Sequence, residues 1–206
     1  MKKLMILFLL SLCLALPQNL WCKSDSDPTS EQLQTAIALP KPDTSGGKPL
    51  MEVLRLRKST RSFSNAPVSE HELSNLLWAA WGINRPTTGH HTVPTSQNEQ
   101  NVQVYVALEN GVWLYDSVAH GLKLMLTEDT RAKFGGSPVT LLFAAEDGHY
   151  ASGMHVGSIY QNAGLYCASA GLNNVVKRTG ANALDGLLKL PEGYRIFIIQ
   201  SVGWPR

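Results

Sequence analysis

The stretch Arg57-Lys58-Ser59-Thr60-Arg61-Ser62-Phe63 is the part around which we organise this chain. It follows an apolar pattern of helical spacing, so it is expected at the end of a helix. Arg57 and Arg61 can reach one anion from two sides, and the Ser59 hydroxyl can donate a further hydrogen bond to it. The stretch therefore predicts a small clamp for a phosphate group. A solvated basic helix end is the alternative interpretation, because most runs of charge are of that kind.

The overall composition indicates one globular domain. The chain has 206 residues, with 44% apolar and 17% charged residues, which is typical of a single folded domain rather than a disordered chain. The formal net charge is only +2, so we expect no nucleic acid and no anionic membrane as a general partner.

Residues 1–24 have the layout of a secretory signal peptide. Two lysines follow Met1, and an almost unbroken apolar run of about a dozen residues comes next, too short to span a bilayer. A polar stretch begins at Lys23. We expect this segment to be removed, which would make the mature protein periplasmic or secreted. An uncleaved membrane anchor is an alternative.

The cysteines bear on the same question. Cys13 and Cys22 lie in the predicted signal peptide, so the mature chain would retain only Cys167 and no internal disulfide. A lipoprotein anchored at Cys22 is a further alternative, which Trp21 directly before it disfavours.

Residues 25–48 are interpreted as a tether, because they contain three prolines and Gly46-Gly47 and little periodic apolar content. The folded domain is expected to span residues 49–206. Its first helix carries Leu50, Val53 and Leu54 at helical spacing.

A second helix is predicted from Ser69 to about Gly82. Ser69 and Glu72 form the pattern of a capping box, and an apolar face follows it. The segment 102–108 then alternates apolar and polar residues, and Asn110-Gly111 predicts a type I′ turn before a returning strand at 112–115.

A further strand is predicted at 138–145, where apolar residues run continuously, and a last strand is predicted at 195–202. Residues 84–101 are expected to form a polar loop. Short helices are predicted at about 118–126, 128–134 and 181–189. This order of elements indicates an α+β fold with a central, mainly antiparallel sheet flanked by helices.

A long helix is predicted over 152–171, and it is rich in glycine, alanine and serine. Each glycine weakens a helix by roughly 1 kcal/mol relative to alanine. Several glycines in one helix therefore indicate that the helix packs closely against a neighbour. The packing partner is either another helix of the same chain, a second subunit or a flat ligand.

Several of these segments together resemble the nitroreductase-like FMN flavoproteins, and more closely the branch that includes the peptide-azoline dehydrogenases and related exported bacterial proteins. The resemblance covers about residues 37 to 206. It is carried by Leu39-Pro40-Lys41-Pro42, Gly46-Gly47, Arg57 to Phe63, Leu76 to Asn84, Pro94 to Asn98, Val104-Tyr105-Val106, Gly157, Gln161-Asn162, Gly171-Leu172 and Val202 to Pro205.

The resemblance implies an intertwined homodimer that binds one FMN at each of two subunit interfaces. It assigns the phosphate to Arg57, Ser59 and Arg61, with Lys58 between them. It further implies cofactor contacts from a loop of the partner subunit, from the backbone near the flavin N5 edge and from the C-terminus, here Pro94, Thr95, Ser96 and Asn98, then Lys177, Arg178 and Thr179, and finally Arg206.

The function implied by the resemblance is that of an FMN-dependent oxidoreductase. The flavin would carry hydride or electrons between a donor and a small organic acceptor such as a nitroaromatic or a quinone. An exported FMN-binding protein without turnover, or a family member that binds another flat ligand, are the alternatives. Thr95, His91 and His155 depart from the residues common in this branch, which leaves the substrate open.

Two other kinds of site are not expected. His90-His91, His149 and His155 match no metal-binding motif, so no metal is predicted. No glycine-rich dinucleotide fingerprint follows a strand. Because export would separate the protein from NAD(P)H, its electrons would come from a substrate that is dehydrogenated or from a membrane redox partner.

Overall fold

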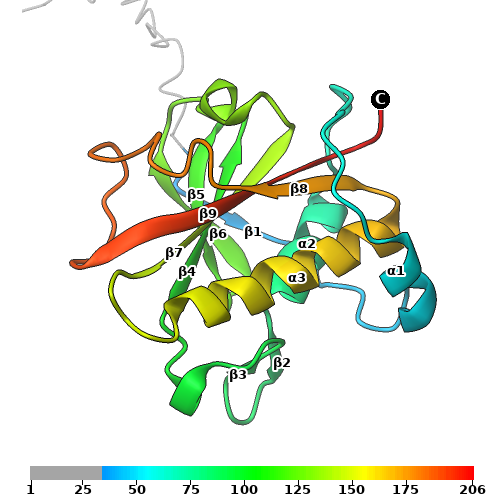
Figure 1. Cartoon of the computed structure of the whole chain (residues 1–206), viewed down its shortest axis with the longest axis horizontal. Helices are drawn as coiled ribbons and strands as arrows, with labels where there is room; N and C mark the ends of the chain where they lie inside the picture. Colours follow the sequence, from blue (N-terminus) through cyan, green and yellow to red (C-terminus); the bar gives the residue numbers. More distant parts are fainter. Residues whose placement is uncertain (1–33) are drawn as a thin grey trace, which may run out of the picture. The chain divides into compact units, whose positions relative to one another are not determined.

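A seven-stranded antiparallel sheet lies at the centre of the structure, a computed structural model that describes residues 34–206 (Figure 1). The strand order is β1-β6-β5-β4-β7-β9-β8, and every neighbouring pair is antiparallel. The predicted α+β fold with a mainly antiparallel sheet is thereby confirmed. The strands are β1 (Ala36–Ala38), β4 (Val102–Leu108), β5 (Gly111–Asp116), β6 (Gly121–Leu126), β7 (Val139–Glu146), β8 (Asn173–Lys177) and β9 (Tyr194–Gly203), with a separate pair β2 (Ile83–Arg85) and β3 (His90–His91).

The predicted signal peptide at 1–24, the alternative anchor at Cys22 and the first part of the tether lie outside the described residues. Within residues 34–206, none of the helices has the length and hydropathy that a bilayer-spanning segment needs.

Three helices accompany the sheet: α1 (Leu50–Leu56), α2 (Glu70–Trp81) and α3 (Ser152–Ala170). All three were predicted close to these bounds. The capping box of α2 is present, because Ser69 accepts a hydrogen bond from the Glu72 N–H at 3.2 Å and Glu72 accepts one from the Ser69 N–H at 2.9 Å. The described residues also contain two 3₁₀ turns, η1 (Ser96–Asn98) and η2 (Arg131–Phe134).

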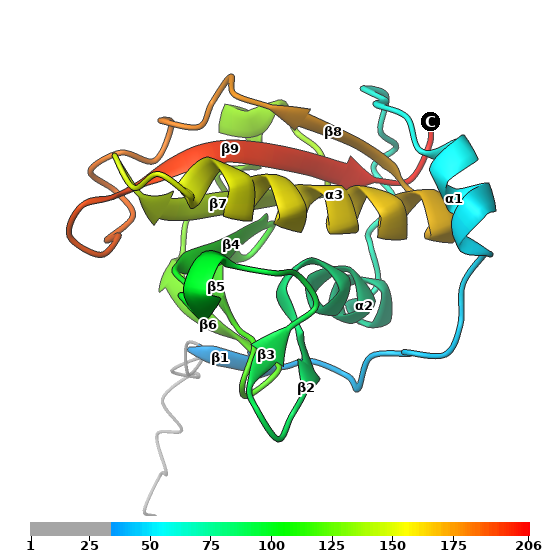
Figure 2. The ribbon, with the colours of Figure 1, turned by 60° about the horizontal axis from the view of Figure 1, so that its bottom comes forward.

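The sheet separates two apolar cores. Helices α2 and α3 lie side by side on one face, as Figures 1 and 2 show. Their fully buried Leu76, Leu77 and Ile159 pack there with Trp113 and Phe143 of the sheet. The opposite face is covered by η2 and by the irregular segment before β9, which bury Phe134, Leu184 and Leu188 against Tyr105, Leu142 and Ile199.

The predicted helix at 118–126 is wrong, because residues 121–126 form strand β6, which pairs with β5 on one side and β1 on the other. The predicted helix at 181–189 is also wrong. That segment makes turns, with Gly186 at φ +77°, although it still buries Leu184. Of the helix predicted at 128–134, the structure has only η2.

The hairpin between β4 and β5 is shifted by one residue from its predicted turn. Leu108 pairs with Gly111, so Glu109 and Asn110 form the two-residue connection. Neither of them has a positive φ, which a type I′ turn requires at both positions, so the predicted turn type is wrong. Gly111 has φ +134°, and a Cβ there would lie 2.3 Å from the Leu126 carbonyl oxygen.

The second half of the predicted tether packs onto the domain. Residues 36–38 form β1, a strand that the sequence analysis did not anticipate. The Pro40 carbonyl accepts a hydrogen bond from the Ser74 hydroxyl at 2.6 Å, and the Asp43 N–H donates one to Asn75 Oδ1 at 2.7 Å. These two hydrogen bonds tie the segment to α2.

Candidate functional site

The predicted clamp segment, residues 57–63, lies along the outer edge of β8. The Thr60 N–H donates to the Asn174 carbonyl at 2.8 Å, and the Asn174 N–H donates to the Thr60 hydroxyl at 3.1 Å. Asn173 Nδ2 adds a bond to the Ser62 carbonyl at 2.7 Å. The backbone of the segment is thus fixed to the sheet after α1 ends at Arg57.

The side chains of the clamp remain exposed. Lys58 and Thr60 line a cavity of about 200 Å³ between the segment and the end of α3. Arg57, Ser59 and Arg61 do not line this cavity, and their side chains are exposed.

Lys177 brings a further cation to this edge. It lies at the end of β8, and its ammonium group donates to the Phe134 carbonyl at 2.5 Å. Burial lowers the pKa of Lys177, and the nearby positive charge of Arg61 lowers it further. An anion placed between Arg61 and Lys177 would relieve their repulsion.

The other residues predicted near this edge are exposed. Arg178 and Thr179 follow directly after β8. The C-terminal residues run beside the segment that follows the clamp, since the Ser64 N–H donates to the Trp204 carbonyl at 2.9 Å and Trp204 Nε1 donates to the Pro67 carbonyl at 3.2 Å. Arg206 is exposed two positions beyond Trp204.

The cations of the clamp fit an anionic group. Among residues 34–206, Arg57, Arg61 and Lys177 have no carboxylate within salt-bridge distance, whereas Arg131 and Arg195 each pair with an aspartate. Charged side chains gathered without counter-charges favour a bound anion such as a phosphate.

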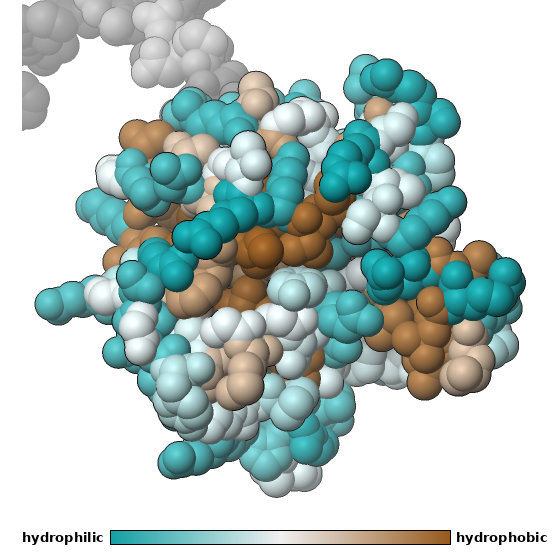
Figure 3. Space-filling model, in the orientation of Figure 1, coloured by the Kyte–Doolittle hydropathy of each residue, from teal (hydrophilic) through white to brown (hydrophobic). Residues whose placement is uncertain are grey.

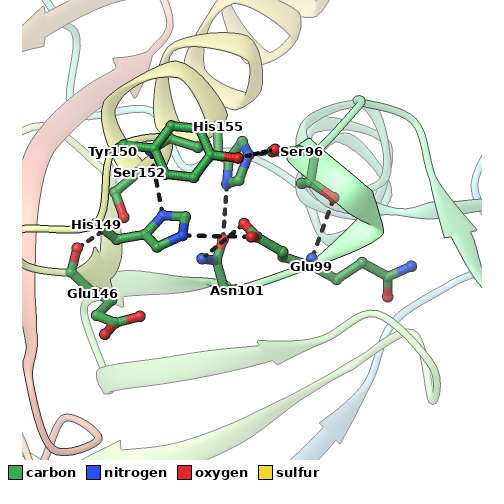
Figure 4. Close-up of polar contacts among 11 residues, drawn as sticks. Ser96, Glu99, Asn101, Glu146, His149, Tyr150, Ser152 and His155 are labelled. Atoms are coloured by element: carbon green, nitrogen blue, oxygen red, sulfur yellow. Dashed lines mark hydrogen bonds and ion pairs between the residues drawn. The ribbon is translucent and has the colours of Figure 1, made fainter.

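The second predicted cofactor segment, Pro94–Asn98, lies elsewhere in the molecule. The Ser96 N–H donates to Nε2 of His155 at 2.7 Å, and His155 is in the first turn of α3 (Figure 4). Gln97 and Asn98 have positive φ values of +48° and +59°, so this loop has an unusual backbone shape.

The two predicted halves of the site are at opposite ends of α3. The loop contacts the start of the helix, whereas the clamp contacts β8, which begins just after the helix ends at Ala170. A helix of 19 residues is roughly 28 Å long, longer than an FMN molecule. Clamp and loop therefore lie at opposite ends of this helix within one chain.

Three of the histidines considered for a metal, His91, His149 and His155, have hydrogen-bond partners in the protein. His91 is buried, stacks on Trp81 with a centroid distance of 3.9 Å and hydrogen-bonds its carbonyl through Nδ1 at 2.7 Å. Both ring nitrogens of His155 have protein partners. Within the described residues no group of three or more histidine, cysteine, aspartate or glutamate side chains is arranged to hold a metal ion.

Sequence reasoning missed the residues that hold the site in place. Asn173 and Asn174 fix the clamp, yet their partners lie more than a hundred positions away, as the separation of 114 residues between Asn174 and Thr60 shows. No local pattern signals such a contact. His155 was noted only as an unusual residue, and its bond to Ser96 spans 59 positions.

Comparison with known proteins gives a consistent result. A protein of Methanocaldococcus jannaschii, named a candidate nitroreductase, is 28% identical over 172 residues, which is 69% of this chain and 85% of that protein. The crystal structure of a candidate nitroreductase from Ralstonia eutropha superposes with a TM-score of 0.77 at 37% identity, over 85% of this chain and 91% of the other.

A nitroreductase from Bacteroides fragilis, whose crystal structure contains bound FMN, has the same fold at 13% identity, with a TM-score of 0.55 over 77% of this chain and 89% of the other. The model of the Nitroreductase family matches residues 54–204, a span that runs from α1 through the clamp to the end of β9. The chain described here therefore belongs to the nitroreductase family.

Proposed function

We propose that this protein is an FMN-dependent oxidoreductase whose flavin is held between two copies of the chain. The observation that carries the proposal is that the segment bearing Arg57 and Arg61 is fixed to the edge of β8, with Lys177 close to Arg61, and that none of these three cations has a carboxylate partner among residues 34–206. The FMN in the related Bacteroides fragilis structure supports the same cofactor.

The residues of the clamp would hold the phosphate of the cofactor. Arg57 and Arg61 would donate charge-assisted hydrogen bonds to the phosphate oxygens, and Ser59 would add one from its hydroxyl. Bound FMN would supply the hydride and electron transfer. Lys177 and the backbone that follows it, up to Thr179, would place a positive charge and N–H donors beside the ring, which favour a reduced, anionic flavin.

A homodimer would complete the site. The Pro94–Asn98 loop and the clamp lie at opposite ends of α3, so the loop of a second copy would contact the flavin. Helix α1 offers a surface for that contact, since Leu50, Met51 and Leu54 are 63%, 75% and 46% exposed. Figure 3 shows apolar surface on the right, where α1 lies in Figure 1. Exposed apolar patches of this kind mark protein interfaces.

The location and the electron donor are part of the proposal. The signal-peptide pattern of residues 1–24 favours an exported protein, and the sequence motifs favour the peptide-azoline dehydrogenase branch. Outside the cytoplasm the donor would be a substrate that is dehydrogenated or a membrane redox partner, and the acceptor a small organic molecule such as a quinone or a nitroaromatic. An exported FMN-binding protein without turnover is the second candidate, because the clamp alone requires only binding.

The absorbance spectrum of the purified protein tests the cofactor. We expect a yellow protein that retains FMN in a ratio of one per chain. Protein that stays colourless after incubation with FMN would contradict the proposal. Anaerobic titration with candidate donors, followed by reoxidation with a quinone or a nitroaromatic, tests turnover. A flavin that binds but cannot be reduced by any donor would favour the second candidate.

A further inference from the structure

His155 is a buried histidine whose two ring nitrogens are both used. The residue is only 2% exposed, and Nε2 lies 2.7 Å from the backbone nitrogen of Ser96. A backbone N–H can only donate, so Nε2 must accept and carries no proton. Nδ1 lies 2.8 Å from Oδ1 of Asn101 and therefore donates to it (Figure 4). These contacts require a neutral ring with its proton on Nδ1.

The loop that His155 holds is also bonded to Gln100, whose N–H donates to the Thr95 hydroxyl at 3.2 Å and whose Nε2 donates to Asn98 Oδ1 at 3.0 Å. The hydroxyl of Ser96 hydrogen-bonds that of Tyr150, which lies on the turn between β7 and α3 and is 67% exposed. Gln97 has a left-handed backbone conformation that is unfavourable for a glutamine, and Asn98, a residue type that tolerates this region better, has the same conformation. A loop of this shape persists only where its surroundings hold it, and the bond from Ser96 to His155 is its buried attachment to α3.

We propose that His155 is a positioning residue that holds the Pro94–Asn98 loop in this shape only while its imidazole ring is neutral. Protonation would place a second N–H on Nε2, directly against the N–H of Ser96. Two donors cannot share a hydrogen bond, so the loop would move away from α3. This inference rests on the proposed function, in which the same loop contacts FMN bound to the partner subunit.

The charges around His155 determine the direction of the pH effect. Burial lowers the pKa of His155, the Glu99 carboxylate opposes this by raising it, and a positive charge on His149 lowers it. His149 Nε2 itself lies 3.4 Å from a Glu99 oxygen. Among the other ionisable groups nearby, Tyr150 is bonded to Ser96, and Asp147 pairs with Arg195 at 2.6 Å.

The lowered pKa of His155 sets the direction in which pH affects the loop. The neutral form dominates above about pH 6.5, the ordinary pKa of histidine, so the loop is held there in full. As the pH falls below that value, protonation becomes linked to release of the loop.

Glu146, at the end of β7, is the remaining charged residue near the start of α3, and its side chain is exposed. Its backbone carbonyl accepts a hydrogen bond from the Ser152 hydroxyl at 2.8 Å, which keeps the first turn of α3 in place.

The variant H155Q separates titration from structure. A glutamine oxygen can accept from the Ser96 N–H and its amide can donate to Asn101, but the side chain does not titrate. H149Q is the matched control, because it removes a neighbouring histidine whose ring does not contact the Ser96 N–H.

The first measurement follows the Ser96 amide in ¹H–¹⁵N spectra of the purified protein between pH 8 and pH 5, without added flavin. In the wild-type protein and in H149Q we expect the Ser96 resonance to titrate below about pH 6.5. In H155Q it should stay at its high-pH position. A Ser96 resonance that titrates equally in H155Q, or that does not respond in the wild-type protein, would overturn the proposal.

The second measurement is the Kd for FMN at pH 7.5 and pH 5.0, from quenching of flavin fluorescence. Protonation of the FMN phosphate below about pH 6 weakens binding in the wild-type protein and in H155Q alike, so the ratio of the Kd of the wild-type protein to that of H155Q isolates His155. That ratio should be close to one at pH 7.5, and at pH 5.0 the wild-type protein should bind roughly threefold to tenfold more weakly than H155Q.

The two measurements distinguish failure of the inference from failure of the proposed function. If neither protein binds FMN at any pH, the proposed function is wrong, and the Ser96 resonance still decides whether His155 holds the loop. If both proteins bind FMN with the same pH dependence, the inference about His155 is wrong and the proposed function is unaffected.

Discussion

The buried side chain of Gln200 in β9 donates a hydrogen bond from Nε2 to Oδ1 of Asn174 in β8, at 3.0 Å. Gly164 of α3 lies above this pair, and a Cβ added there would come within 3.5 Å of Asn174 Oδ1 and 3.6 Å of Gln200 Nε2. The backbone of the same Asn174 binds Thr60. The clamp segment is thus connected through one asparagine to the interior of the sheet.

Asn174→Leu should lower the stability of the domain. The substitution leaves the Gln200 amide buried without an acceptor, which costs about 1–3 kcal/mol in the free energy of unfolding. Denaturant titration measures this cost. Asn182→Leu, at an exposed position, is the control and should change the free energy by less than about 0.5 kcal/mol. Equal stability of the two variants would show that the Gln200 contact contributes nothing.

Arg57→Ala combined with Arg61→Ala should give a folded protein that is colourless. Both side chains are exposed, so the fold does not depend on them, but each would lose charge-assisted hydrogen bonds of about 1.5–3 kcal/mol to a phosphate. We expect the Kd for FMN to rise by at least roughly a hundredfold. Equilibrium dialysis gives the Kd, and circular dichroism confirms folding.

Arg55→Ala serves as the matched control for the clamp. Arg55 is an exposed arginine in the last turn of α1, two positions before the clamp, so Arg55→Ala removes one neighbouring positive charge where the double variant removes two. It should leave the Kd for FMN within about twofold of the wild-type value, since distant exposed charges contribute little. Retention of stoichiometric FMN by the double variant would refute the assignment of the phosphate.

Met51→Glu should convert a dimer into monomers. Met51 is 75% exposed in the single chain, so a glutamate there does not disturb the core, but at an apolar interface it would bury an unpaired charge. Sedimentation velocity should show a species of half the wild-type mass that has lost its flavin. Val118→Glu, at a residue 84% exposed and distant from α1 in the sequence, should remain dimeric. A monomeric wild-type protein that binds FMN would contradict the two-subunit site.

The stability of the protein should fall as the pH drops below about 6.5. Burial lowers the pKa of His91, His120 and His155, so the unfolded chain binds protons before the folded one does, and the stabilisation present above pH 6.5 is progressively lost. The free energy of unfolding measured at pH 7.5 and at pH 5.0 should differ in this direction. Equal values at both pH values would contradict the assignment of three neutral histidines.

His120→Gln should reduce that pH dependence. His120 Nε2 lies 2.7 Å from the Ser74 hydroxyl, and Nδ1 lies 2.9 Å from the Tyr115 hydroxyl, so the ring joins the residues that follow β1 to α2 and β5. Removing these bonds should lower stability at pH 7.5 by about 1–3 kcal/mol, while the loss between pH 7.5 and 5.0 becomes smaller than in the wild-type protein. Thermal denaturation at both pH values would measure the two effects.

Much of the fold could be predicted because several segments have strong local signals. The capping box at Ser69, the alternation over 102–108 and the continuous apolar run before Glu146 each specify one kind of element. The residues of β6 do not. They contain leucine, lysine and methionine, which favour a helix in isolation, and it is pairing with β1 and β5 that makes them a strand.

The clamp could be predicted for a similar reason, since Arg57, Ser59 and Arg61 lie close together in the sequence itself. The contacts with β8 that hold the clamp in place could not be predicted. Strand β8 has only Val175 and Val176 as β-branched residues, and it forms because β9 pairs with it along five residues. The position of the Pro94–Asn98 loop depends on His155, and its proposed partner belongs to another copy of the chain.

Both margins of the seven-stranded sheet are protected. On one side β1 is only three residues long, and on the other the hydrogen-bonding groups at the start of β8 are already taken by residues 60 and 62. A free, long strand margin invites another polypeptide to add on and start ordered aggregation. Within residues 34–206 neither margin of the sheet is a long, free strand, so a second copy would approach through helices and loops rather than by extending the sheet.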